Sequence, residues 1–187
     1  MSTLAVKTLQ GILPTNLITV SPGHRLTAPG HVVQVQSTTL TAAWSASVPT
    51  GTWTDVTGLT VNITPMYISS KIYISGMIYG NGQSTATQFY FKLVRNGIPV
   101  GVGDLAGSRQ QITGRCYYAD ANVLPAGCPF AHFDSPASTS TLTYKIQVTT
   151  ESSTYGIYVN RTQSDNDGST SNGGRCASNI TVMEIAQ

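Results

Sequence analysis

Short segments in which apolar and polar residues alternate recur along most of this chain of 187 residues. A period of two is the pattern of a β-strand with one buried face, because successive side chains point to opposite sides of the pleat. Residues 71–79 and 142–148 follow this pattern most regularly. The side chains that we expect in the core from these two segments are Ile72, Ile74, Ile78, Leu142, Tyr144, Ile146 and Val148.

Turn residues separate the strand-like segments. Asn96 and Gly97 tolerate the positive φ angles of a tight hairpin, and they divide residues 88–95 from residues 98–100. Charged residues make up only 10% of the chain, against roughly 25% in ordinary domains, so strong helix formers are scarce. Further strand signals lie at residues 32–36, 53–63, 157–159 and 179–185. The pattern predicts an all-β fold, a jelly-roll-like β-sandwich with eight or more short strands.

The first 31 residues differ from the rest, since Pro-Gly pairs and short apolar runs exclude a long helix and favour extended pieces with turns. We expect an N-terminal attachment arm at residues 1–31 and a β-sandwich head domain at residues 32–187. The alternative is that the first residues form a simple hairpin of the main sheet. The apolar residues expected to make the attachment are Leu13, Leu17, Ile18 and Val20.

The formal net charge of +2 comes from basic residues that are scattered and form no stripe, which argues against nucleic acid as a partner. No apolar run approaches the roughly 20 residues that span a bilayer, and the first residues lack the layout of a secretory signal. We therefore expect a protein made in the cytosol that does not insert into a membrane.

Three cysteines, Cys116, Cys128 and Cys176, are too few for a disulfide scaffold and too irregularly spaced for a zinc site. Cys116 and Cys128 could close a loop on oxidation, but without a secretion signal we expect reduced, buried cysteines. Cys116 is also the best candidate for a nucleophile, although small buried cysteines are far commoner than catalytic ones. No Gly-x-Ser-x-Gly turn or nucleotide-binding glycine motif occurs. The sequence thus predicts no catalytic residue and no cofactor.

The three histidines, His24, His31 and His132, are not spaced as metal ligands. Residues 165–168 resemble the first half of a calcium loop, but the glutamate that would close such a loop is absent. We therefore expect no metal site.

Aromatic side chains near turns are the best candidates for contact with a ligand, because sugars are commonly held by aromatic planes and a few polar groups. The two longest turn-rich stretches, residues 101–114 and 163–174, are where binding would be sought first. Packing beneath these loops, or against another subunit, is the alternative role. The candidate receptor-binding residues are Tyr117, Tyr118, Phe130, His132 and Tyr155.

Several motifs resemble small virion proteins of tailed bacteriophages, especially those of aquatic or cyanobacterial phages. They are the run from Thr52 to Pro65 with Asp-Val-Thr-Gly-Leu at its centre, Ser-Ser-Lys-Ile at residues 69–72, and Phe91 to Gly97. The resemblance implies a tail-fibre or appendage subunit, homotrimeric, with a jelly-roll head and an N-terminal segment that docks on the particle. It also implies other virion proteins and a host surface glycan or protein as partners, and the virion as the location.

Two other functions remain as alternatives. One is a capsid decoration, cement or tail-assembly protein, which would bury its arm and edges in the particle. The other is a polysaccharide-degrading enzyme, which would need a pair of carboxylates within about 10 Å in a groove. The chain has only eight acidic residues, mostly at turn positions, so we expect a structural and recognition protein and not an enzyme.

Overall fold

The computed structural model describes residue 20 and residues 28–83, 88–117, 125–151, 153–168 and 173–187. These parts of the chain form β-strands and contain no helix, so none that could cross a membrane is present in them. The strands are β1 (Val32–Leu40), β2 (Trp44–Val48), β3 (Thr54–Ile63), β4 (Lys71–Gly82), β5 (Gln88–Arg95), β6 (Ile98–Val100), β7 (Gly114–Tyr117), β8 (Ala126–Asp134), β9 (Leu142–Thr150), β10 (Tyr155–Val159) and β11 (Ser178–Ile185).

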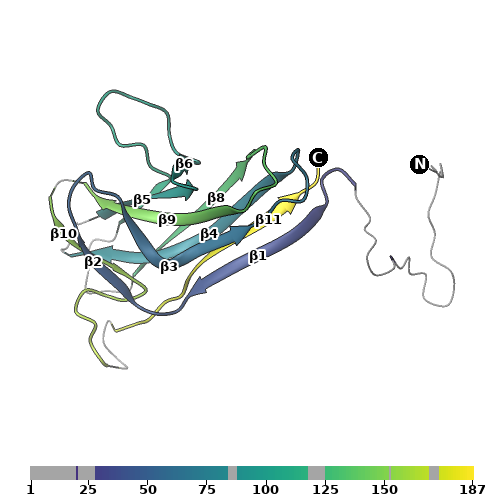
Figure 1. The fold of residues 1–187 in the computed structure, drawn as a ribbon. Coiled ribbons are helices and arrows are strands. Elements are labelled where there is room, and N and C mark those ends of the chain that lie inside the picture. The colour runs from purple at the N-terminus through teal and green to yellow at the C-terminus, as the bar shows by residue number, and fades with distance from the viewer. Residues whose placement is uncertain (1–19, 21–27, 84–87, 118–124, 152, 169–172) are drawn as a thin grey trace, which may run out of the picture.

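Two antiparallel sheets face each other (Figure 1). In the first, β8 pairs with one edge of β4, while β10 and β11 lie end to end along the other edge and pair in turn with β2 and β1. In the second, the order is β3, β9, β5, and then β6 and β7 end to end. We call these the β4 sheet and the β5 sheet. Each is four strands wide, and together they have the strand arrangement of a jelly roll, which confirms the predicted fold class.

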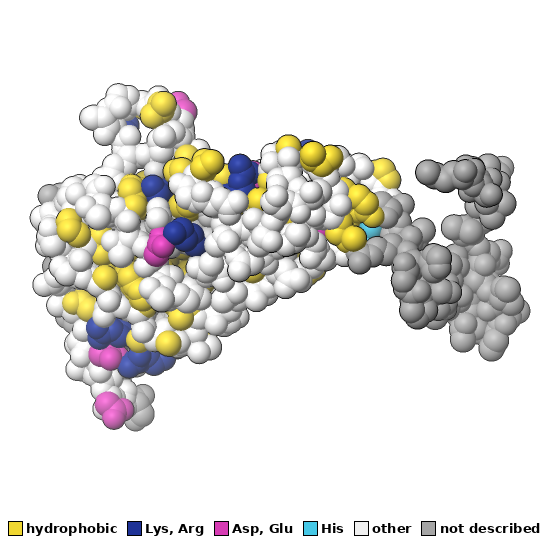
Figure 2. Space-filling model, viewed as in Figure 1, with side chains coloured by type: hydrophobic (Ala, Val, Ile, Leu, Met, Phe, Trp, Pro, Cys, Tyr) yellow, Lys and Arg dark blue, Asp and Glu magenta, His cyan; other side chains and the backbone are white. Residues whose placement is uncertain are grey.

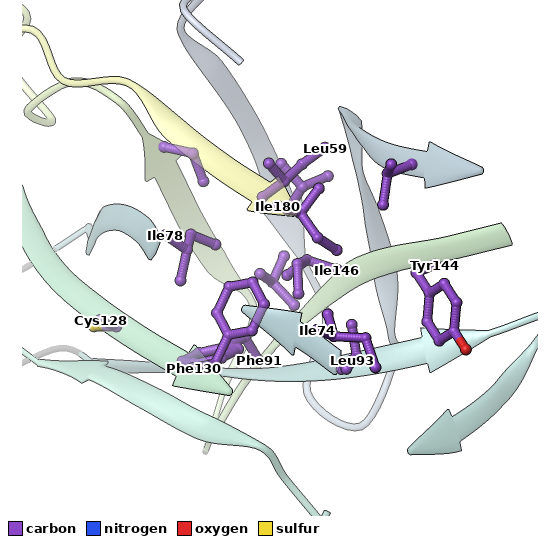
Figure 3. Close-up of a cluster of buried hydrophobic side chains, with 14 of the residues drawn as sticks. Leu59, Ile74, Ile78, Phe91, Leu93, Cys128, Phe130, Tyr144, Ile146 and Ile180 are labelled. Atoms are coloured by element: carbon purple, nitrogen blue, oxygen red, sulfur yellow. The ribbon is translucent and has the colours of Figure 1, made fainter. Parts of the chain in front are cut away.

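The core lies between the sheets, and Figure 3 shows side chains from both sheets meeting there. The seven side chains predicted to be buried are at most 3% exposed. Burying each such aliphatic or aromatic side chain contributes roughly 1.5–3 kcal/mol. The period-two alternation therefore located the core correctly in both sheets.

Two inward-facing glycines of β4 make room for aromatic rings. A Cβ atom at Gly76 would lie 2.5 Å from the ring of Phe130, and one at Gly80 would lie 2.6 Å from the ring of Phe89. Phe130 also packs against Phe91 of the opposite sheet, with ring centroids 6.0 Å apart. The glycines interrupt the apolar alternation of β4 because Phe130 of the neighbouring strand β8 and Phe89 of the opposite sheet fill the space of their missing side chains.

Three strands, β2, β7 and β8, were not among those expected from the sequence. In β8 the reason is its glycine and proline, which are typical of turns. Pro129 is tolerated because β8 lies at the edge of the β4 sheet, where one side of a strand needs no ladder hydrogen bond. This corrects the placement of Phe130 and His132, which lie within a strand and not at a turn.

Asn160, which directly follows β10, links the ends of neighbouring strands in the β4 sheet through its side-chain amide. Its Nδ2 donates to the carbonyl oxygens of Leu40 and Ala42 at 2.7 and 3.0 Å. Its Oδ1 accepts from the backbone and side chain of Ser178 at 3.0 and 2.6 Å. Asn160 is fully buried and has a φ of 63°, a left-handed conformation that asparagine tolerates. One amide thus connects the end of β1, the end of β10 and the start of β11.

A buried carboxylate fastens the turn between β3 and β4. Glu184 is fully buried, and its oxygens accept hydrogen bonds from the side chains of Gln34 and Ser70, both at 2.7 Å. The backbone amides of Met66 and Tyr67 also donate to it, at 2.8 and 3.3 Å. Burial alone would raise the pKa of Glu184, but these hydrogen bonds outweigh burial and lower the pKa below its ordinary value. Glu184 is therefore a structural carboxylate, held in its charged form.

Candidate functional surfaces

The outer face of the β4 sheet carries a row of apolar side chains that crosses four strands. Val35 lies opposite Met183, Met183 opposite Tyr73, and Tyr73 opposite Phe133. Val35 is 49% exposed and Phe133 is 58% exposed, while the rings of Tyr73 and Phe133 lie 4.8 Å apart. We call these four residues the apolar row. A contiguous exposed row of this kind marks a site of interaction more often than scattered apolar residues do.

The β4 sheet is also almost free of exposed charge. The described strands of this sheet contain three charged side chains, and two of them, Glu184 and Asp134, are buried. Lys71, at the start of β4, is the one that is exposed. Beside the apolar row, Ser37 and Thr181 bond through their hydroxyls at 2.9 Å. Figure 2 shows charged side chains as separate spots on a mostly uncharged surface.

The outer face of the β5 sheet is different because it carries charged groups. Lys145 forms an ion pair with Asp55 at 2.6 Å, and the Asp55 side chain is 48% exposed. Lys92 lies over the ring of Trp53, 4.1 Å from its centroid, and partial burial lowers the pKa of Lys92. The outer face of the β5 sheet thus carries an ion pair and a cation–π contact.

Between the sheets, Arg95 donates to both carboxylate oxygens of Asp134, at 2.7 and 2.6 Å. The hydroxyl of Tyr144 donates to the same carboxylate at 2.7 Å. Burial, together with the negative charge of Asp134, raises the pKa of Tyr144. Because Arg95 lies in β5 and Asp134 lies in β8, this cluster joins the two sheets, and its donors and acceptors satisfy one another.

A polar network lies at the start of β5. Gln88 donates through its side chain to Glu151 and accepts from Arg115 at 2.8 Å. The hydroxyl of Tyr90 donates to the same Glu151 oxygen, Oε2, at 3.4 Å, while the hydroxyl of Tyr155 donates to the backbone oxygen of Gln88. Burial and the Glu151 charge raise the pKa of Tyr90. The network brings β5, β7, β9 and β10 together.

A pocket of about 410 Å³ adjoins this network, below the loop between β6 and β7. The loop stands out from the sandwich in Figure 1. It is closed by hydrogen bonds from the amide of Gly103 to the oxygen of Ile112, at 3.2 Å, and from the side chain of Gln111 to the oxygen of Gly103, at 2.7 Å. The residues that line the pocket are Tyr90, Ser108, Arg109, Gln110, Ile112 and Glu151.

The structure places the predicted receptor-binding residues in two different environments, and the first contains Tyr117 and Tyr155. Tyr117 is 49% exposed, with the guanidinium of Arg115 5.9 Å from its ring. Tyr155 is half-buried and bonded to Gln88, the cross-strand partner of Tyr117, so these two tyrosines belong to the same end of β5. Tyr118 lies outside the described residues.

The other two candidates point inward. Phe130 is 7% exposed and belongs to the core, so its expected surface contact is corrected to a packing role. His132 is half-buried, and its ring lies 2.9 Å from where a Cβ atom of Gly101 would be. Gly101 has a φ of 60°, which favours glycine, so His132 packs beneath the start of the β6–β7 loop.

The sequence pointed to the loop of this pocket but missed most of the polar residues beside it. Gln88, Tyr90 and Arg115 were not candidates because they lie in strands whose outward side chains look like ordinary polar surface. Glu151 is 63 residues from Gln88 in the chain, and nothing in the local pattern predicts that pairing. The available signal was the length of the stretch from residue 101 to residue 114.

The cysteines correct another expectation. Cys116 of β7 and Cys128 of β8 form a disulfide, with Cα atoms 5.7 Å apart, and Cys176 is free. The expected reduced state of Cys116 and Cys128 is therefore not what the structure contains. The physical reason is that β7 and β8 lie at facing edges of the two sheets, which the spacing in the sequence does not reveal. Bonded in this way, Cys116 offers no thiol for catalysis.

The attachment arm lies almost wholly outside the described residues, including Leu13, Leu17 and Ile18. Val20 is described and is 42% exposed. Among the described residues, no three His, Cys, Asp or Glu side chains gather in a way that could hold a metal ion.

The fold places the chain in the class of jelly-roll β-sandwiches. No protein-family model matches the chain, and no curated protein matches it. Among solved structures, it is similar to the VP2 protein in a crystal structure of the infectious bursal disease virus VP2 subviral particle, at 13% identity and a TM-score of 0.32. The match covers 91% of this chain and 42% of that one, so the chain spans less than half the length of that protein.

Proposed function

We propose that this chain is a structural subunit of a virus particle, namely the β-head of a tail fibre or appendage of a tailed bacteriophage. It assembles as a homotrimer, docks on the particle through residues 1–31, and recognises a host surface receptor, a glycan, through its head. It has no catalytic role. The observation that carries the proposal is the apolar row on an outer sheet face that is almost free of charge.

This face suits contact between copies of the same chain. Interfaces between identical subunits are more apolar than the remaining surface and are depleted of charge at their centre. Two exposed side chains, Val35 and Phe133, stand at the two ends of the apolar row. Because Lys71 is the exposed charge on the described strands of this sheet, a second copy would meet little like-charge repulsion.

The base of the proposed arm is fixed to the head. The amide of Gly30 donates to the oxygen of Ala186 at 2.7 Å, and the amide of Ala186 donates to the oxygen of His31 at 3.0 Å. The last strand, β11, lies between β1 and β4, so both of its edges are already paired. This arrangement supports docking through the N-terminal arm in preference to docking through the C-terminal strand, because an arm can add to a partner's sheet edge.

Recognition is assigned to the side of the head that the assembly face leaves free. The β6–β7 loop, the pocket and the polar network belong to the β5 sheet, whereas the apolar row belongs to the β4 sheet. In a trimer that buries the apolar row, the pocket therefore stays open to solvent. Long ordered loops on a rigid scaffold are where binding residues concentrate.

The test combines the mass in solution with the place in the particle. Light scattering of the full chain is expected to give three times the chain mass of 19.8 kDa. Antibody labelling of phage particles is expected to mark the tail or its appendages, and deleting residues 1–27 should abolish incorporation while the head still binds cells. A monomer that stays monomeric on particles would overturn the trimer, and labelling of the capsid surface would favour a decoration protein.

A further inference from the structure

One of the residues that line the pocket below the β6–β7 loop has a buried polar atom that nothing in the described structure satisfies. This atom is the side-chain oxygen of Gln110, which receives no hydrogen bond from the described residues. Thr149 has a buried, unpartnered hydroxyl as well, and it is the cross-strand partner of Tyr90 on the same face of the β5 sheet. An unsatisfied buried polar group costs about 1–3 kcal/mol, so such groups are uncommon unless something else satisfies them. Of these two residues, Gln110 lines the pocket, and a ligand hydroxyl would satisfy its oxygen.

The charges around the pocket select against an ionic ligand. Arg109 and Glu151 both line it, so a net anion would be repelled by Glu151 and a net cation by Arg109. Gln88 and Tyr90 both donate to Oε2 of Glu151, and none of the described residues donates to Oε1, which can accept from a ligand. A carboxylate oxygen that accepts from a hydroxyl forms one of the stronger hydrogen bonds available to a neutral molecule.

The remaining lining supplies apolar contact and a second donor. Tyr90 and Ile112 line the pocket beside the hydroxyl of Ser108. An aromatic ring can pack against the C–H face of a sugar while polar groups bond its hydroxyls. The volume of about 410 Å³ lies at the small end of the range for small-molecule sites, roughly 300–1,000 Å³. The hydrogen bonds of Gly103 with Ile112 and Gln111 hold the loop in place before any ligand arrives.

We infer that this pocket binds a neutral pyranose unit of a surface polysaccharide. The side-chain oxygen of Gln110 and Oε1 of Glu151 accept hydrogen bonds from sugar hydroxyls, and Arg109 and Ser108 donate to sugar oxygens. The inference rests on the proposed role of the head in glycan recognition, and it assigns that role to a pocket and a ligand class. The described lining contains one carboxylate, which fits binding of the sugar and not its hydrolysis by a carboxylate pair.

The test uses saturation-transfer NMR on the full chain with the methyl glycosides of glucose, galactose and mannose, and with glucuronic acid and glucosamine as charged probes. Saturation transfer to at least one neutral glycoside is expected, with weaker transfer to both charged probes. Gln110→Leu and Glu151→Gln should each weaken binding about tenfold, which is the loss expected of one charge-assisted or buried hydrogen bond. Asp55→Asn, which alters a carboxylate on the same sheet outside the pocket, should leave binding unchanged.

Thermal unfolding separates a ligand-binding role of Gln110 from a structural one. Because its oxygen has no hydrogen-bond partner among the described residues, Gln110→Leu should not lower the melting temperature, although it weakens binding. Absence of transfer to every neutral glycoside, or equal transfer in all variants, would overturn the inference.

Particle and cell assays distinguish a failure of the proposed function from a failure of the assigned pocket. If the protein incorporates into particles and adsorbs to cells equally well with and without Gln110→Leu, the proposed function stands and the assigned pocket is wrong. If the neutral glycosides bind but the chain is not found in particles, the pocket stands and the proposed function is wrong.

Discussion

The two sheets of the sandwich differ in where their charged side chains lie. The β4 sheet turns a nearly uncharged surface outward, with the apolar row across it, and buries Glu184 inside. The β5 sheet keeps its carboxylates Asp55 and Glu151 at or near the surface, beside cations, amides and tyrosines. A charge-free face suits permanent burial against another subunit, whereas partly exposed polar groups can exchange water for a ligand. This difference is the reason why we propose assembly through the β4 sheet and recognition through the β5 sheet.

The largest effect is expected from a charge placed in the apolar row. Phe133→Glu puts a carboxylate next to Tyr73, at one end of the apolar row in the proposed interface, where burial of an unpaired charge is strongly unfavourable. We expect the dissociation constant of the trimer to rise at least about 100-fold, in line with the loss of an interface hot spot. Light scattering over a range of concentrations measures it.

Asn62→Glu is the matched control, since Asn62 is exposed in β3 of the other sheet. It should leave the trimer intact. Equal dissociation by both variants would mean that the two faces do not differ in the way that we propose.

The disulfide tests how far the two sheets depend on a covalent link. Cys116 and Cys128 are separated by 12 residues, and closing a loop of this length stabilises a protein by about 3 kcal/mol through the unfolded chain. Replacing both cysteines by serine should lower the free energy of unfolding by about that amount in urea titrations. Cys176→Ser should have little effect because Cys176 is free. A loss of similar size from Cys176→Ser would contradict the assignment of the bond.

Removing the charge of the buried carboxylate in the β4 sheet should lower the free energy of unfolding by about 2 kcal/mol. Glu184→Gln keeps the shape of the side chain but removes the negative charge to which four groups donate hydrogen bonds. Hydrogen bonds to charged groups contribute about 1.5–3 kcal/mol. The pKa of Glu184 is lowered from 4.5 in the folded protein, so the unfolded chain binds more protons near that pH. The stabilisation is therefore complete above pH 4.5 and is lost as the pH falls through the folded pKa.

Urea titrations between about pH 3 and pH 7, a range that brackets the ordinary pKa of glutamate, measure this dependence. In the Glu184→Gln variant the curve of stability against pH should be flatter at its acidic end. An unchanged curve would show that Glu184 does not supply the dependence.

Replacing the exposed carboxylate of the β5 sheet, Asp55, should have the smallest effect on the free energy of unfolding. Burial alone would raise the pKa of Asp55, but hydrogen bonds from Lys145 and Gln147 outweigh burial and lower it. Because Asp55 is about half exposed, its ion pair contributes no more than about 1 kcal/mol. Asp55→Asn should change the free energy of unfolding by less than about 1 kcal/mol, and the effect should shrink in high salt. A loss as large as that of Glu184→Gln would remove the contrast between the two sheets.

Much of the candidate site could not be predicted, for reasons that particular residues make clear. Phe130 was expected at the surface because Gly127 and Pro129 are typical of turns, yet the edge position of β8 tolerates both. Tyr90 and Glu151 meet across the β5–β9 side of the sheet, and a period-two pattern says which side chains share a face of one strand but not which strands are neighbours.

The sequence by itself determined the class of fold and the core, because alternation with a period of two decides which side chains each strand buries. It also marked two stretches, residues 101–114 and 163–174, as the places to seek binding, because long connections between strands often carry function. Only the tertiary structure decided that Cys116 meets Cys128, that the apolar row crosses four strands, and that the buried oxygen of Gln110 has no partner in the part of the chain that the structure describes. Each of these depends on which distant segments become neighbours, and that is set by the packing of the whole chain.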